Sequence, residues 1–113
     1  MRQNNNSKID YIENELKKFR SMFNLRISGN SMNPVLYDGE IVNVIPISML
    51  SRKLEIGDII VYRKFESHFT AHRIKDINML SNKRYYCITK GDNNENNDNY
   101  IVYNHEILGL IEM

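Results

Sequence analysis

A serine on a tight turn is the first feature of this sequence that could carry out chemistry. Ser31 lies within residues 28–34 (SGNSMNP), between a glycine and a proline. The glycine permits a close approach of the chain and the proline fixes its exit, so the serine would be presented on a rigid turn. Such a serine could offer its Oγ as a nucleophile and its backbone N–H to an oxyanion. The same residues also occur in ordinary turns, so the segment alone does not decide the function.

A histidine and two aspartates further along the chain could complete a hydrolytic site. His72 lies in the alternating segment AHRI, and a neutral imidazole is the natural base for a serine hydroxyl near neutral pH. Asp92 lies in the segment KGDNN, and Asp98 follows six residues later. A carboxylate that accepts the Nδ1 proton of His72 would hold the useful tautomer, whereas Asp92 could instead cap its own turn. Both aspartates therefore remain candidates for this role.

The composition indicates one ordinary globular domain and argues against several classes of function. The chain has 113 residues, of which 42% are hydrophobic and 26% charged, with a formal net charge of +1. This charge and the lack of a basic stripe argue against nucleic acid as a partner. Cys87 is the only cysteine, so no intramolecular disulfide is possible and a metal site is not expected, which fits the cytoplasm. No stretch approaches the roughly 20 apolar residues of a membrane span, so we expect a soluble protein. We also expect the protein to need no cofactor.

The hydrophobic pattern divides the chain into an N-terminal helix and a β domain. Apolar residues recur at helical spacing from Ile9 to Phe23, which predicts an amphipathic helix from about residue 8 to about residue 20. Its polar face mixes acidic and basic residues, so the helix would pack on the domain or dock a partner protein rather than bind an anionic membrane. We assign residues 1–22 to the tail and this helix, and residues 23–113 to the β domain.

Short runs rich in Ile, Val and Tyr follow Phe23 and alternate with turn signals. This pattern predicts a mostly β domain of short antiparallel strands. The expected strands are residues 25–27, 41–46, 58–63, 70–77, 85–90 and 107–111. The asparagine-rich run 93–99 is expected to be a solvated loop, and His68 and His105 are expected at the surface.

The order and spacing of these segments resemble the signal peptidase family, within the S24/S26-type superfamily. The closest likeness is to its Ser–His branch, found in archaea, the endoplasmic reticulum and spore-forming bacteria. The segments that carry the resemblance are Ser31-Met32-Asn33-Pro34, Gly57-Asp58, His72-Arg73-Ile74, Lys90-Gly91-Asp92-Asn93-Asn94 with Asp98, and a closing Ile107-Leu108-Gly109. The resemblance covers about residues 25–112. It implies a signal-peptidase-like β fold and a serine endopeptidase that cleaves leader or precursor peptides.

The resemblance also implies a role for each matching residue. Ser31 takes the place of the nucleophile and His72 that of the general base, while Asp98 would orient His72 and Asp92 would shape the loop. The backbone N–H of Ser31 would serve the oxyanion hole. Three residues would shape the nucleophile turn: Gly29, Met32 and Pro34. The family's second oxyanion donor is often a hydroxyl two residues before the nucleophile, a position that holds glycine here and leaves this donor open.

Two departures from the resemblance bear on the substrate. Bacterial signal peptidases and self-cleaving repressors use a lysine where this chain has His72, and Lys75 would lie on the opposite strand face. Signal peptidases are membrane anchored and the repressors carry a DNA-binding domain, whereas only about 24 residues precede the serine segment here. We therefore expect a soluble leader peptidase that acts in trans on an extended peptide or precursor protein. The alternatives are a catalytically silent peptide-binding module of the same fold and a self-processing regulator.

Overall fold

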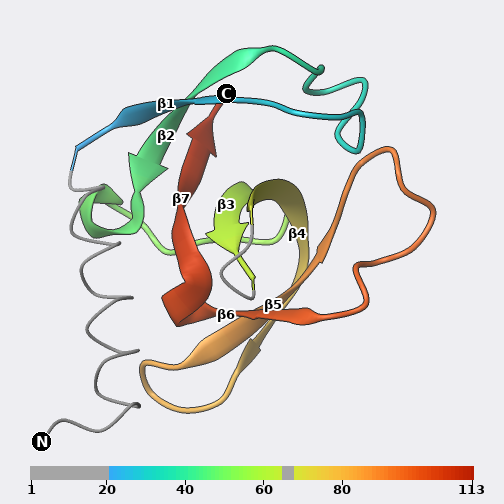
Figure 1. The fold of residues 1–113 in the computed structure, drawn as a ribbon. Helices are drawn as coiled ribbons and strands as arrows, with labels where there is room; N and C mark the ends of the chain where they lie inside the picture. The colour runs from blue at the N-terminus through green and yellow to red at the C-terminus, as the bar shows by residue number, and fades with distance from the viewer. Residues whose placement is uncertain (1–20, 65–67) are drawn as a thin grey trace, which may run out of the picture.

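The computed structural model describes residues 21–64 and 68–113, which form a curled, seven-stranded antiparallel sheet (Figure 1). The strands are β1 (Phe23–Arg26), β2 (Ile41–Pro46), β3 (Ile59–Arg63), β4 (Phe69–Met79), β5 (Tyr85–Lys90), β6 (Ile101–Tyr103) and β7 (Ile107–Glu112). Two short 3-10 turns, η1 (Ile47–Met49) and η2 (Asn104–Glu106), follow β2 and β6. The order across the sheet is β1-β2-β7-β3-β4-β5-β6, so β1 and β6 are its edges.

The mostly β architecture predicted from the sequence is confirmed. Two strands have the predicted bounds, 41–46 and 85–90, and β6 was missed because it has only three residues and follows the asparagine-rich run. The predicted helix over residues 8–20 lies outside the described residues. Within the described part of the chain, no helix has the length and apolar character that crossing a membrane requires.

The core lies on both faces of β3, the strand between β7 and β4. Alternate side chains of a strand point to opposite faces, so Ile59 and Val61 enter one apolar cluster while Ile60 and Tyr62 enter the other. All four are at most 2% exposed. Because Tyr62 belongs to the second cluster, β3 brings a phenolic hydroxyl into an otherwise apolar layer.

The two halves of β4 have different neighbours in the sheet. Residues 69–73 pair with β3, and the pairing with β5 runs from Arg73 to Met79 with a register shift at Lys75. Among the described residues, Thr70 to His72 therefore pair with a strand on one side only. These residues of β4, like residues 24–26 of β1, have a strand edge that a further extended chain could reach.

The loop between β1 and β2 and the loop between β5 and β6 lie beside each other (Figure 1). The first loop closes on itself, because Ile27 N–H donates to the Glu40 carbonyl at 2.8 Å and Gly39 N–H donates to the Ile27 carbonyl at 2.7 Å. A backbone bond of 2.8 Å from Asn93 N–H to the Ser31 carbonyl joins the second loop to the first. These bonds bring residues distant in sequence to one place.

Candidate active site

The turn that carries Ser31 is anchored in the core by the next residue, Met32. Met32 is 2% exposed and packs in the first core cluster, and a helical turn follows in which Leu36 N–H donates to the Met32 carbonyl at 2.9 Å. Gly29 has a φ of +85°, a conformation that favours glycine, and its N–H donates to Asp38 Oδ1 at 2.8 Å. The peptide bond before Pro34 is cis. Gly29, Met32 and Pro34 therefore all belong to the turn that presents Ser31.

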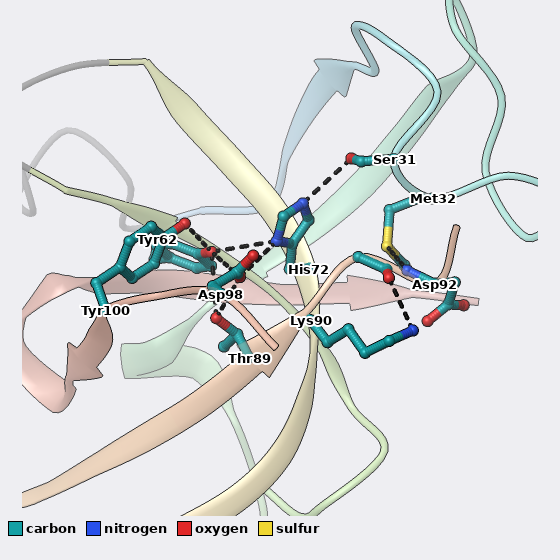
Figure 2. Close-up of polar contacts among 10 residues, drawn as sticks. Ser31, Met32, Tyr62, His72, Thr89, Lys90, Asp92, Asp98 and Tyr100 are labelled. Atoms are coloured by element: carbon teal, nitrogen blue, oxygen red, sulfur yellow. Dashed lines mark hydrogen bonds and ion pairs between the residues drawn. The ribbon is translucent and has the colours of Figure 1, made fainter. Parts of the chain in front are cut away.

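His72 lies between Ser31 and Asp98 and contacts both (Figure 2). Its Nε2 is 3.1 Å from Ser31 Oγ, and its Nδ1 is 2.7 Å from Asp98 Oδ2. In the neutral imidazole, Nδ1–H donates to the carboxylate, which leaves Nε2 as the acceptor that faces the serine hydroxyl. The side chains of His72 and Asp98 are 10% and 11% exposed, so the pair is largely shielded from water.

Asp92, the other candidate carboxylate, contacts an arginine and not His72. Arg73 holds it in a bidentate pair, with Nε 2.9 Å from Oδ1 and Nη2 2.7 Å from Oδ2. The guanidinium lowers the pKa of Asp92 below its ordinary value, and the carboxylate raises the pKa of Arg73. Asp92 N–H also donates to Met32 Sδ at 3.3 Å. The structure therefore brings Asp98, and not Asp92, into contact with the histidine.

Gly91 lies where the two loops come closest to the imidazole. It is buried, and a Cβ placed on it would lie 2.7 Å from the Ser31 carbonyl oxygen and 3.1 Å from His72 Nε2. Real Cβ atoms essentially never approach a backbone oxygen that closely. The contact between the two loops therefore depends on the absence of a side chain at this position.

Ser31 and His72 both open onto a cleft of about 360 Å³ between β1 and β4. One wall is formed by the end of β1 and the residues after it, the other by the start of β4, and Tyr100 completes the lining. The lining residues are Leu25, Arg26, Ile27, Ser28, Ser31, Met32, Phe69, Thr70, Ala71, His72 and Tyr100. In the described part of the chain, the bordering residues 25–26 of β1 and 70–72 of β4 each pair with a strand on one side only.

The two lysines and the two other histidines that the sequence analysis considered do not join the contacts among Ser31, His72 and Asp98. Lys75 is exposed at the bulge of β4, and Lys90 Nζ donates to the Gly91 carbonyl at 3.1 Å. His68 and His105 are exposed, as predicted. Across residues 21–64 and 68–113, no group of three or more His, Cys, Asp and Glu side chains has the arrangement of a metal site.

Sequence reasoning missed three hydroxyls around Asp98. Thr89 Oγ1 donates to Asp98 Oδ2 at 2.7 Å, Tyr62 donates to the same oxygen at 3.2 Å, and the hydroxyls of Tyr62 and Tyr100 are 2.8 Å apart. The one sequence signal was a polar residue, Thr89, on the inward face of a strand that also buries Cys87.

Comparison with protein families gives a match over residues 1–111 to the family described as Peptidase S24-like. No curated protein and no solved structure matches the chain significantly. The family match agrees with the S24/S26-type superfamily that the sequence segments resemble, and this superfamily includes serine peptidases. Because the match spans nearly the whole chain, this protein belongs to the Peptidase S24-like family.

Proposed function

We propose that this protein is a serine endopeptidase that cleaves leader or precursor peptides, with Ser31 as nucleophile and His72 as general base. The observation that carries the proposal is the unbroken line of contacts from Ser31 Oγ to His72 Nε2 at 3.1 Å and from His72 Nδ1 to Asp98 Oδ2 at 2.7 Å. A nucleophile within hydrogen-bond reach of a base that a third group orients is the general signature of nucleophilic hydrolysis.

The geometry supports a two-stage reaction. Ser31 Oγ attacks the scissile carbonyl carbon while its proton passes to His72 Nε2, and the resulting imidazolium is stabilised by Asp98. His72 then gives this proton to the leaving amine as the C–N bond breaks, which leaves an acyl ester on Ser31. Water attacks the ester, its proton passes to His72 Nε2, and the same proton returns to Ser31 Oγ as the acid product leaves.

The oxyanion of the tetrahedral intermediate needs donors near Ser31. The backbone N–H of Ser31 is the first, as the family resemblance implies. The N–H of Gly29 is already bonded to Asp38 Oδ1, which argues against it as the second. Ser28 lines the same cleft as Ser31 and carries a hydroxyl, so we assign the second donor to Ser28.

The cleft favours a substrate bound as an extended strand. Among the described residues, 24–26 of β1 pair only with β2 and 70–72 of β4 pair only with β3, so a peptide between them could hydrogen-bond to both edges. Leu25, Phe69 and Ala71 line the two walls, so the side chains next to the scissile bond should be small and apolar.

The base in this proposal differs from the lysine of the bacterial signal peptidases and self-cleaving repressors. A lysine acts as a base only where burial keeps it neutral, but Lys75 is exposed. His72, by contrast, is 8% exposed and within reach of the serine. These contacts support the Ser–His arrangement for this member of the family.

The test is to incubate the wild type, Ser31→Ala and His72→Gln with a mixed peptide library and to read the products by mass spectrometry. The proposal predicts cuts after small apolar residues by the wild type alone. Cleavage that survives Ser31→Ala would refute it, and a folded wild type that binds library peptides without cutting any would favour the silent binding module. The same incubation without peptides tests self-processing, because a cut within the chain itself would appear as two fragments.

A further inference from the structure

The Asp98 carboxylate is surrounded by hydroxyl groups on the side away from Ser31 (Figure 2). The Tyr62 hydroxyl lies 3.2 Å from Asp98 Oδ2, 3.3 Å from Thr89 Oγ1 and 3.5 Å from His72 Nδ1. Thr89 Oγ1 is 2.7 Å from the same Asp98 oxygen. Three donors, one each from His72, Thr89 and Tyr62, therefore converge on a single carboxylate oxygen.

Packing alone does not account for these two hydroxyls. Tyr62 and Thr89 are both 0% exposed, and Tyr62 packs among the apolar side chains of the second core cluster. Phenylalanine and valine would fill nearly the same volumes without burying a polar group, which is costly unless the group is hydrogen-bonded. Every hydrogen bond described for the two hydroxyls leads to Asp98, to His72, to each other or to Tyr100.

The count of protons assigns a direction to the two hydroxyl bonds that reach Asp98 and to the bond between the two tyrosines. An ionised Asp98 only accepts, and each hydroxyl has one proton to give. Thr89 gives its proton to Asp98, Tyr62 does the same, and Tyr100 can donate to Tyr62. Burial, with the nearby Asp98 carboxylate adding to it, raises the pKa of Tyr62 and Tyr100, so both phenols stay protonated donors at physiological pH.

We propose that Tyr62 and Thr89 are positioning residues that hold Asp98 Oδ2 against His72 Nδ1 and so keep Nε2 aimed at Ser31. Asp98 lies on the loop between β5 and β6, where one backbone bond of 2.8 Å to the Thr89 carbonyl ties it to β5. The two hydroxyls come from β3 and β5, the strands on either side of the strand that bears His72. They fix the carboxylate from both flanks. The catalytic consequence rests on the proposed function, but the positioning itself does not.

The positioning can be measured without any substrate. Proton NMR of protein with 15N-labelled histidine should show a low-field resonance for His72 Nδ1–H, because this proton lies in a short bond to a carboxylate. The resonance should move upfield or vanish in Tyr62→Phe and Thr89→Val, and most clearly in the double variant. Tyr86→Phe is the matched control, because Tyr86 lies on the opposite face of β5 from Thr89 and its ring packs against Tyr103.

The second measurement is the reactivity of Ser31 towards 4-nitrophenyl acetate, a small activated ester whose acetyl group is detected on the protein by mass. Each substitution should lower the rate of acetylation about tenfold, as expected for the loss of a hydrogen bond to a charged group. For any peptide found to be cleaved, kcat should fall while KM stays constant. Tyr86→Phe should leave the acetylation rate, kcat and KM unchanged.

The outcomes separate this proposal from the proposed function. A wild type without the low-field resonance, or folded variants in which resonance and acetylation rate both match the wild type, would overturn the positioning role. Thr89→Val decides the matter alone if Tyr62→Phe fails to fold. The His72 resonance could depend on both hydroxyls while the wild type cleaves no peptide. That result would refute the peptidase proposal and would support the positioning role.

Discussion

The substitution Gly91→Ala tests whether the contact between the two loops sets the distance from Ser31 to His72. The added Cβ would lie 2.7 Å from the Ser31 carbonyl oxygen, where ordinary contact begins at 3.4 Å. One of the two groups must therefore retreat by about 0.7 Å, and neither is the end of a flexible side chain. The Asn93 N–H bond to the same carbonyl, 2.8 Å long, would be disturbed as well.

The expected loss of activity is measurable in a protein that stays folded. A misplacement of about 1 Å in an active site costs about 100-fold in rate, so Gly91→Ala should lower kcat by between about tenfold and about 100-fold. Overpacking of this kind destabilises a protein by about 1–3 kcal/mol, which leaves a typical domain folded.

Gly57→Ala is the matched control for that substitution. Gly57 has a φ of +100°, and a Cβ added to it would have no atom within 4 Å, so alanine there is strained but meets nothing. The strain costs about 1–2 kcal/mol, a destabilisation similar to that expected at Gly91. Thermal unfolding and steady-state cleavage of a library peptide would be measured on both variants. Full activity in Gly91→Ala, or an equal loss of activity in Gly57→Ala, would refute the reasoning.

The two aspartates should differ in their effect on turnover: Asp98→Asn should lower kcat by about 10⁴-fold, as in the serine protease triad, whereas folded Asp92→Asn should retain most activity. The reverse order in steady-state kinetics would contradict the assignment of Asp98. Burial raises the pKa of the Cys87 thiol to about 11, so a thiol reagent at pH 8 should label Cys87 only after unfolding, and rapid labelling of the native protein would contradict its burial. Arg73 lowers the pKa of Asp92, so the ion pair between them stabilises the folded protein above the ordinary pKa of aspartate. This stabilisation is lost as pH falls through the lowered pKa. Acidification should therefore reduce the free energy of unfolding of the wild type more than that of Arg73→Met, and equal pH dependence would count against the ion pair.

Several elements of the fold were predictable because their side chains alternate. The strand over residues 41–46 alternates between exposed and buried positions along most of its length, which is the pattern that sequence analysis detects. β4 was predicted too short, as residues 70–77, because its last residues are partly exposed and do not continue the alternation. β6 follows an asparagine-rich run and gave no pattern of its own.

The order of the candidate site residues along the chain was predictable from the sequence. The residue pattern alone left both Asp92 and Asp98 open, and only the family resemblance favoured Asp98. The contact itself depends on how the loop returns, because Asp98 N–H bonds back to the Thr89 carbonyl at 2.8 Å. Tyr62 is 36 positions from Asp98 and reaches it only because β3, β4 and β5 are adjacent in the sheet. Contacts of this kind follow from the order of strands in the sheet, which the side-chain pattern within one strand does not give.

Trapping a covalent acyl intermediate on Ser31 during turnover is the most direct test of the proposed function. Wild type mixed with a cleaved library peptide would be quenched in acid, digested and mapped by mass spectrometry. We expect an acyl group on the peptide that contains Ser31. The fraction of acylated enzyme should be larger when His72-assisted deacylation is slower than acylation than when it is faster. An acyl group on another residue, or turnover with an unmodified Ser31 peptide in a quench that traps a control serine acyl-enzyme, would contradict the proposed function.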